Sequence, residues 1–516
     1  MKKGGILITI VILLVAVGVY FLQNWWFDRQ QTSTSDSGKK VQVLRYAKDS
    51  YIGYAPLEGV EMKKALARNG IALKATDDGG DYQTRLKEFA DGKYDFIVLP
   101  INAYIEHGMQ YKFPGVVVAG IAESTGADGI VGFEDLIKTG KVNDLNDENI
   151  KIAYVPASPS SFLIDLTIAD FGLDQLANSN SWRREFDNSN ELFSSLQKAV
   201  KERPQGKGNH PDFYALWEPE LSKATKLGLK KIWGSDQFRG YIIDVFVFHR
   251  DFVNRHPSKI NDFLTTYFDV MAQYQADQKN FIRELASISS MSRDEVSEML
   301  PNIHWYDMIE NCSDLFGLQT ILEVTPKEGL INSIISCNTV MYRMRTITEN
   351  ITNPYLLVNS SFLEKIRDDN FQNLPNLPTK SQQFTFDPIN ESQFLRLKEV
   401  GTIRIEDISF RLGSDTPDEL GESMIDNFAL MLVNNYPQYR LIIKGHTGEG
   451  DDQVNMLLSQ ARADMVRQRL IAIHNINPDR ILAKGYGSSQ PPVRKPNENI
   501  RLYKNRWARV EFVLVR

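Results

Sequence analysis

Cysteine and histidine are scarce in this chain, which has two cysteines and seven histidines among 516 residues. No histidine stands at metal-ligand spacing beside Cys312 or Cys337, which argues against a metal site, and no cofactor is indicated. The histidines are scattered, and the sequence offers no Ser-His-Asp or Cys-His arrangement of the kind that activates a nucleophile. We therefore expect that the protein is not an enzyme.

Runs of basic residues are also missing. The 59 Lys and Arg residues are dispersed, and 65 acidic residues give a formal net charge of -6. Proteins that bind nucleic acid concentrate basic residues along the path of the phosphates, so no nucleic-acid partner is expected. The chain length and a hydrophobic content of 42% allow two or three domains, each with its own core.

One long apolar run is present, at the N-terminus. Residues 6–22 are almost wholly apolar, follow Lys2 and Lys3, and precede the aromatic residues 25–27. The run is long enough to span a bilayer, and no small-x-small cleavage site follows it, which indicates an uncleaved signal anchor within residues 1–29. The basic flank places the N-terminus in the cytoplasm and the rest of the chain outside it. No ionisable side chain lies within the span, which argues against a proton-driven stator.

Strands and helices alternate from residue 41 onward, after a polar stalk at residues 30–40. The pattern predicts strands at 41–47, 71–77 and 94–100 and helices at 57–70 and 82–92, an α/β fold with a parallel sheet. Ligands bind past the carboxyl ends of the strands in such sheets. The candidate ligand contacts follow the expected strands: Ser50, Tyr51, Asn102, Ser124, Thr125, Ser158, Ser160 and Ser161. Trp217 and Glu218 add an aromatic wall and a carboxylate, unless Trp217 belongs to the core.

The loop at residues 157–161 leads from an expected strand into a helix that begins near Phe162. Free backbone N–H groups and hydroxyl groups converge at such a helix start, which favours a bound anion. The alternative is that Ser160 or Ser161 only caps the helix.

Four segments resemble the periplasmic solute-binding proteins of the nitrate, sulfonate and taurine uptake group: residues 91–105, 127–132, 152–173 and 214–219. The resemblance covers residues 41–368 and rests on the order and pattern of the segments. It implies two α/β lobes joined by a hinge, the second lobe at about 132–240, which close on a small and often anionic organic molecule. It also implies an ABC permease as partner and a role in transport.

The composition changes at residues 369–396, which repeat Asn, Gln and Pro with little apolar periodicity. This composition is typical of a semi-extended linker. The linker is long enough to carry a terminal domain, residues 397–516, away from the binding module.

A helix is expected from about Asp451, with an apolar stripe that should face a core: Val454, Leu457, Leu458, Ala461 and Met465. Beside the stripe, Asn455, Ser459 and Arg462 recur at i, i+4 and i+7, next to a turn at 445–448. A planar guanidinium is well matched to a free carboxylate, which it can hold with two hydrogen bonds. The pattern therefore predicts a site for a small zwitterion.

This helix, with GYGSSQP at 485–491 and RVEF at 509–512, resembles the OmpA-like peptidoglycan-binding domain, a smaller α+β fold. The resemblance implies capture of the diaminopimelate side chain of the cell-wall stem peptide. Arg462 would hold the carboxylate of that side chain, with Thr447, Asn455 and Ser459 as the other members of the motif.

The sequence departs from the family at one position. The family has an Asp directly after the Thr, whereas Thr447 is followed by Gly448 and the loop is one residue shorter. The ammonium group of the ligand then lacks its usual partner. Glu449 or Asp451 could replace the missing Asp if the shortened loop brings one of them close enough.

Together these features predict a single-pass protein of the bacterial inner membrane with most of the chain in the periplasm. It would capture a small, anionic organic ligand and attach to peptidoglycan. The alternative is an envelope sensor or an assembly and scaffold protein that uses the clamp for signalling; an enzyme on the clamp fold of thiamine-precursor synthases has little support. An oxidising periplasm would allow a disulfide between Cys312 and Cys337, a pairing that the sequence leaves open.

Overall fold

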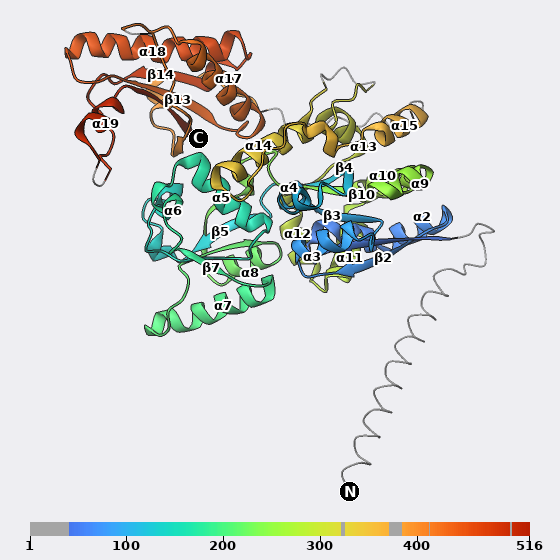
Figure 1. Cartoon of the computed structure of the whole chain (residues 1–516). Helices are drawn as coiled ribbons and strands as arrows, with labels where there is room; N and C mark the ends of the chain where they lie inside the picture. Colours follow the sequence, from blue (N-terminus) through green and yellow to red (C-terminus); the bar gives the residue numbers. More distant parts are fainter. Residues whose placement is uncertain (1–40, 321–325, 371–383, 412, 496–497) are drawn as a thin grey trace.

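The computed structural model describes residues 41–320, 326–370, 384–411, 413–495 and 498–516 (Figure 1). The expected membrane anchor, the stalk and residues 371–383 of the expected linker lie outside these ranges. Within them, no helix combines the length and the apolar character that crossing a membrane requires. The described chain forms two α/β lobes and a terminal α+β domain.

The first lobe is built on a six-stranded sheet with the strand order β11-β4-β10-β3-β1-β2. Its strands are β1 (Gln42–Lys48), β2 (Ile71–Asp77), β3 (Phe96–Pro100), β4 (Gly115–Ser124), β10 (Ile243–His249) and β11 (Ile303–Trp305). Strands β1, β2 and β3 run parallel, and α2 (Val60–Arg68) and α3 (Tyr82–Ala90) connect them. The predicted βαβ alternation at the start of the chain is therefore confirmed.

The second lobe has a five-stranded sheet with the order β7-β6-β8-β5-β9. Its strands are β5 (Asp128–Gly132), β6 (Ile152–Tyr154), β7 (Arg183–Glu185), β8 (Phe213–Trp217) and β9 (Lys230–Gly234). Its main helices are α5 (Pro159–Phe171), α7 (Ser189–Glu202) and α8 (Glu220–Lys226). The second lobe thus begins slightly before the predicted start at residue 132.

The chain crosses between the lobes twice, from β4 to β5 and from β9 back to β10. The Ser124 and Ser235 hydroxyl oxygens lie 2.7 Å apart, and the Asp128 backbone N–H donates to Ser235 Oγ at 3.1 Å. The Ser124 backbone N–H also donates to the Ile242 carbonyl at 3.0 Å. The two crossings are therefore tied together as one narrow hinge.

Helix α4 (Ile101–Gly108) follows β3 and packs against the sheet of the first lobe. After β10 the chain completes this lobe with the helices α10 (Pro257–Ala276), α11 (Gln278–Ser289), α12 (Arg293–Met299) and α15 (Ser361–Asn370). The core beside α10 is aromatic, with Phe263 packed against Phe96, Phe246 and Phe248. Helix α14 (Gly329–Met344) packs against both α4 and α5, so it bridges the two lobes.

The terminal domain has a four-stranded sheet with the order β12-β15-β13-β14. Its elements are β12 (Glu399–Ile403), α17 (Glu419–Asn434), β13 (Arg440–His446), α18 (Asp452–Ala472), β14 (Ile481–Gly485), α19 (Ile500–Asn505) and β15 (Arg509–Val515). Phe428 of α17 stacks on Phe512 of β15 with the ring centroids 3.8 Å apart. The predicted α+β fold is therefore present.

The end of the expected linker belongs to this domain. Phe394 of the short helix α16 (Glu391–Phe394) packs with Ile442, Val513 and Val515 in a small core. The boundary predicted at residue 397 therefore falls too late, because an aromatic side chain before it completes the apolar face of the sheet.

The apolar stripe predicted for α18 is wrong. Val454 is 61% exposed and Leu457 is 73% exposed, whereas Ser459 and Ala463 are fully buried. A Cβ atom on Gly445 would lie 2.1 Å from the Ser459 carbonyl, so the helix approaches the sheet too closely for large side chains. Small residues therefore face the sheet, and the larger apolar residues at the start of the helix face away.

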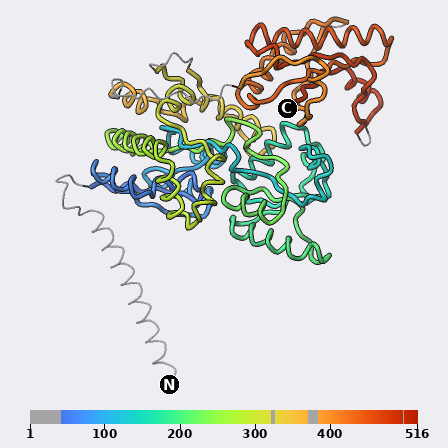
Figure 2. Tube along the Cα trace, turned by 180° about the vertical axis from the view of Figure 1, so that it is seen from behind, coloured from blue at the N-terminus to red at the C-terminus, as the bar shows by residue number. Residues whose placement is uncertain are grey.

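The terminal domain packs directly on the second lobe (Figures 1 and 2). Tyr436 donates a hydrogen bond to Asp170 at 2.6 Å, and the Arg239 backbone N–H donates to the Asn435 carbonyl at 2.9 Å. One continuous cluster of buried residues includes Leu163 of the second lobe and Leu432 of the terminal domain. The prediction that the linker carries this domain away from the binding module is therefore not met.

The two cysteines do not form the disulfide that the sequence left open. Both are free and fully buried. Cys312 belongs to one of the two main clusters of buried residues, whereas Cys337 lies on α14 in the other, where its thiol donates to the Tyr241 carbonyl. Pairing would require two separate cores to rearrange, so the structure keeps both thiols apart.

Candidate functional site

A cavity lies where the two lobes meet beside the hinge. Tyr51, Tyr54 and Tyr82 line it from the first lobe, and Asp128 and Trp217 line it from the second lobe. About 10 Å³ of its space admits the centre of a water molecule. A cavity of this size holds about one water, so the clamp is closed in this conformation.

The segment 52–58 follows β1 at the carboxyl end of the parallel strands. Tyr54 lies in this segment, and Tyr51 is the residue just before it. Tyr54 donates a hydrogen bond to Asp244, and the Tyr51 hydroxyl is buried without a partner in the described chain. The two rings meet edge to face with centroids 5.3 Å apart. The cavity therefore has a rigid aromatic wall that carries one unused hydroxyl group.

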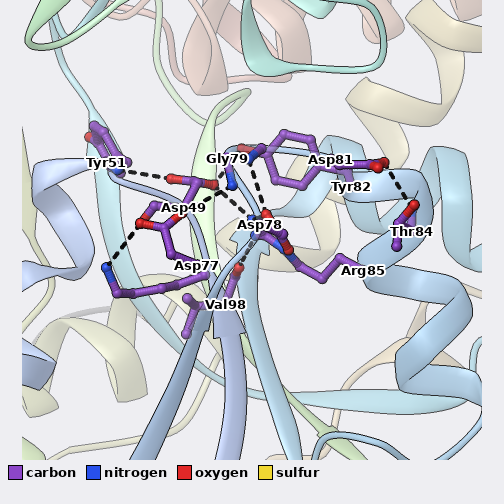
Figure 3. A network of polar contacts seen from close by, with 12 residues as sticks. Asp49, Tyr51, Asp77, Asp78, Gly79, Asp81, Tyr82, Thr84, Arg85 and Val98 are labelled. Carbon is purple, nitrogen blue, oxygen red and sulfur yellow. Dashed lines mark hydrogen bonds and ion pairs between the residues drawn. The ribbon is translucent and has the colours of Figure 1, made fainter. Parts of the chain in front are cut away.

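A buried ion network supports this wall (Figure 3). The Asp49 carboxylate accepts hydrogen bonds from the Tyr51 backbone N–H at 2.9 Å and from the Tyr82 hydroxyl at 3.0 Å. The fully buried Arg85 guanidinium donates to Asp49 at 3.1 Å and to Asp78 through a second pair of contacts. Because two carboxylates already pair with Arg85, its role is structural and its positive charge is not available to a ligand.

Two further acids, Asp128 and Asp244, line the cavity, and each is 2% exposed. Burial raises the pKa of Asp128 to about 7, and nearby Glu218 and Asp49 push it in the same direction. Burial also raises the pKa of Asp244 well above its usual range. Asp128 Oδ1 has no hydrogen-bond partner among the described residues. These two acids dominate the electrostatics of the site.

At the start of α5, where an anion site was predicted, polar groups of Ser158 and Ser161 are used to cap the helix. Ser158 Oγ accepts from the Ser161 backbone N–H, and Ser161 Oγ accepts from the Ser158 backbone N–H at 3.0 Å. Pro159, the first helical residue, has no N–H to offer. The capping alternative therefore holds for Ser161, which shares the cap with Ser158, whereas Ser160 Oγ is buried without a partner in the described chain.

The remaining predicted contacts divide into two groups. Tyr51 and Trp217 line the cavity, and both polar atoms of the fully buried Asn102 side chain lack a partner among the described residues. Other predicted residues have structural roles or face solvent: Ser124 joins the hinge, Thr125 binds the 301–302 turn through its backbone and hydroxyl, and Ser50 is exposed.

Glu218 is also engaged within the fold. Its carboxylate accepts from the Ser222 backbone N–H at 3.0 Å, from Ser222 Oγ at 2.8 Å and from Asn302 Nδ2 at 3.2 Å. It therefore fixes the start of α8 and is not free to bind a ligand.

Sequence reasoning missed Tyr54, Tyr82, Asp128 and Asp244. The two acids stand at or near the start of strands that otherwise read as apolar runs, DGIVG and IDVFVFH. A carboxylate in such a run is costly to bury, which is the one signal that could have marked them.

The predicted wall site in the terminal domain is centred on Arg462, which is half-buried. Its guanidinium lies over the Phe410 ring at 4.8 Å, and Nε donates to the Ser414 carbonyl at 3.1 Å. The described residues supply no hydrogen bond to its two Nη atoms, so the edge that grips a carboxylate stays available. Asp415 lies close enough to act on the charge of Arg462.

The other predicted members of the wall site are mostly used by the fold. Ser459 is fully buried, donates to the Met456 carbonyl and accepts from the Gly487 N–H, and Asn455 donates to the Gly448 carbonyl. Thr447 Oγ1 is buried without a described partner.

The two suggested replacements for the missing Asp are engaged elsewhere. Glu449 forms an ion pair with Lys504 at 2.8 Å. Asp451 caps α18 by accepting from the Gln453 and Val454 N–H groups. Asp415 is thus the carboxylate that remains beside Arg462.

Part of the terminal domain matches a known protein family. Residues 409–506 match the OmpA family. Over 108 residues the chain is 34% identical to an outer membrane porin F of Pseudomonas fluorescens, a match that covers 20% of this chain and 32% of that porin. The chain thus spans about a third of the length of this curated relative.

Similar solved structures include three periplasmic binding proteins. The aliphatic sulphonate binding protein SsuA of Escherichia coli is 15% identical, with a TM-score of 0.45, covering 69% of this chain and 99% of its own. A putative sulfonate-binding SsuA of Methylobacillus flagellatus KT is 14% identical, with a TM-score of 0.46 and coverages of 64% and 96%. The nitrate-binding protein NrtA of Synechocystis PCC 6803 is 13% identical, with a TM-score of 0.44 and coverages of 64% and 89%.

Proposed function

We propose that the protein is a periplasmic solute-binding clamp that is anchored in the inner membrane and attached to peptidoglycan. The observation that supports ligand capture most directly is the cavity between the lobes. It is lined by residues from both sides of a two-stranded hinge, and Tyr51 Oη and Asp128 Oδ1 are buried there without described partners. Unused polar atoms in a closed cleft are costly unless a ligand or water satisfies them. No catalysis is proposed.

Membrane anchoring rests on residues 6–22 of the sequence, whose length and flanks suit a single span with the large domains outside the cytoplasm. An alkaline phosphatase fused after Arg516 should then be active. Activity of a reporter that works only in the cytoplasm, at the same position, would overturn this topology. In this arrangement an ABC permease is the partner that would receive the ligand.

Wall attachment rests on the available edge of Arg462. We propose that Arg462 holds the carboxylate of the diaminopimelate stem peptide and that Asp415 takes the place of the Asp missing after Thr447 by facing the ligand's ammonium group. Glu449 and Asp451 are excluded from that role because each already has a partner.

An envelope sensor is the second candidate, and a specific contact favours it. The terminal domain packs on the second lobe through Tyr436 and Asp170, so a movement of that lobe would move the wall-binding domain with it. A further cavity of about 710 Å³ lies where the hinge, the first lobe and this domain meet. In it Glu123 accepts from the Gly240 N–H of the hinge at 2.6 Å and from the Tyr306 hydroxyl at 2.9 Å.

Uptake measurements separate the two candidates. Once the ligand is identified, cells that lack the protein should lose its import if the chain serves a permease. Import that continues unchanged, with an altered envelope response to the same ligand, would favour the sensor.

A further inference from the structure

We infer that the clamp binds a ligand through a positively charged amine group, held between Asp128, Asp244 and the aromatic wall of the interlobe cavity. The inference rests on the proposed ligand-binding function and specifies the chemistry of that site. It replaces the anionic ligand expected from the sequence, for which the cavity offers no positive charge.

The balance of charge around the cavity is negative. Four carboxylates act on the buried Tyr51 hydroxyl: Asp49, Asp128, Glu218 and Asp244. Asp49 is satisfied by Arg85 and two other donors, and Glu218 is satisfied by Ser222 and Asn302. Two acids therefore remain in the cavity wall, one from each crossing of the hinge: Asp128, whose Oδ1 has no described partner, and Asp244, whose described partner is the neutral Tyr54 hydroxyl.

The two basic side chains that contact Asp49, those of Arg85 and Lys48, are already paired with acids. Arg85 is shared by Asp49 and Asp78, and Lys48 lies 3.2 Å from Glu58 and 3.8 Å from Asp77. At the start of α5, where an anion was expected, the Ser161 N–H donates to Ser158 Oγ and is not free for an anion. An anion entering the cavity would therefore meet carboxylates at close range, and these repel it strongly in a poorly solvated site.

The remaining lining suits a cation. Tyr51, Tyr54, Tyr82 and Trp217 present four aromatic rings to the cavity. An ammonium group over such rings gains electrostatic attraction from the ring faces, most strongly when it is desolvated. Asp128 Oδ1 and the Tyr51 hydroxyl, both more than nine-tenths buried and without described partners, supply acceptors for its N–H groups.

The position of the two acids links binding to closure. Asp128 opens β5 of the second lobe, and Asp244 lies in β10 of the first lobe. Two ionised carboxylates brought together repel each other, and a cation between them removes that repulsion. A bound amine would therefore favour the closed clamp.

The test is calorimetric titration of the full-length chain, purified in detergent, with methylammonium, ethanolamine and choline and with methanesulfonate, nitrate and acetate. We expect heat from at least one amine and none from the three anions. Asp128→Asn and Asp244→Asn should each lower the affinity for that amine at least tenfold. Asp187→Asn, a change of an exposed acid in the second lobe, should leave its affinity unchanged.

The possible outcomes distinguish failure of the amine inference from failure of the proposed ligand-binding function. Binding of an anion without binding of any amine would overturn the inference and leave the clamp function standing. No heat from all six compounds would overturn both. If Asp244→Asn fails to fold, the comparison of the wild type with Asp128→Asn still tests the inference. Equal amine affinity in these two proteins would refute the role of Asp128.

Discussion

The phenolic oxygen of Tyr436 in the terminal domain donates a 2.6 Å hydrogen bond to the buried carboxylate of Asp170 in the second lobe. Tyr241 donates to the same carboxylate oxygen at 3.2 Å, and burial raises the pKa of Asp170 to about 6. This contact joins the terminal domain to the second lobe. A hydrogen bond to a charged group contributes about 1.5 to 3 kcal/mol.

Tyr436→Phe should therefore loosen the docking of the terminal domain. The loss of about 1.5 to 3 kcal/mol corresponds to a shift of about 10- to 100-fold toward the undocked form. Small-angle X-ray scattering should report a larger radius of gyration for this variant. Tyr503→Phe, in α19 of the same domain, is the matched control and should scatter like the wild type. Unchanged scattering by Tyr436→Phe would mean that the hydrogen bond does not hold the domains together.

Amine binding should depend on pH through Asp128. Its folded-state pKa is about 7, above the unfolded value near 3.9. Between about pH 4 and pH 7 the folded apoprotein keeps a proton that the unfolded chain has released, so this acid makes the apoprotein less stable as the pH rises. A cation requires the ionised carboxylate, so its affinity should rise up to about tenfold per pH unit over this range and level off above pH 7.

Calorimetry with methylammonium across this pH range checks the prediction. The charged groups that act on Asp128 are Glu218 and Asp49, which raise its pKa, and Asp244, whose negative charge repels that of Asp128, so none of them reverses the direction; the Ser124 hydrogen bond opposes the shift and only lessens it. Asp128→Asn should flatten the profile. A profile that falls as the pH rises, or one that Asp128→Asn leaves intact, would contradict the assignment.

The fold was predictable where the local pattern and the tertiary structure agree. The strand predicted at 71–77 has those bounds, and the helix expected from Asp451 begins with that residue as its cap. The apolar face of α18 was not predictable, because the close approach of the helix to Gly445 selects small residues and overrides the general preference for large apolar ones.

The ligand site was only partly predictable for a different reason. Tyr51 lies just after β1 and Trp217 is the last residue of β8, so the rule that ligands bind at the carboxyl ends of strands points to both. Asp128 and Asp244 are separated by more than a hundred residues and meet only because the chain crosses the hinge twice. For the serines near 160 the sequence left an anion site and a helix cap open, and the reciprocal hydrogen bonds of Ser158 and Ser161 show the cap.

Wall binding should require Arg462 and Asp415. A peptidoglycan pull-down of the chain should retain a signal that Arg462→Ala abolishes and Asp415→Asn weakens by about 10- to 100-fold, the cost of a lost charged hydrogen bond. Arg501→Ala, an exposed change in α19, should retain the full signal. An Asp inserted between Thr447 and Gly448 should strengthen retention. If the wild type shows no retention and the insertion restores none, the domain is a protein–protein module.

The cysteines should behave as two buried thiols. Burial raises the pKa of Cys312 to about 12 and raises that of Cys337 further, so neither forms the reactive thiolate near neutral pH. Ellman's reagent should detect no thiol in the native protein and two after denaturation without reductant. No thiol after denaturation would show that Cys312 and Cys337 pair after all.

The central claim is that the cleft between the lobes holds a small ligand, and native mass spectrometry of the full-length chain isolated from its own cells tests it most directly. We predict a mass above that of the polypeptide, from a small molecule that is lost on denaturation and is absent from the Asp128→Asn, Asp244→Asn double variant. A wild-type mass equal to that of the polypeptide alone, before and after incubation with the amines and anions named above, would contradict the account.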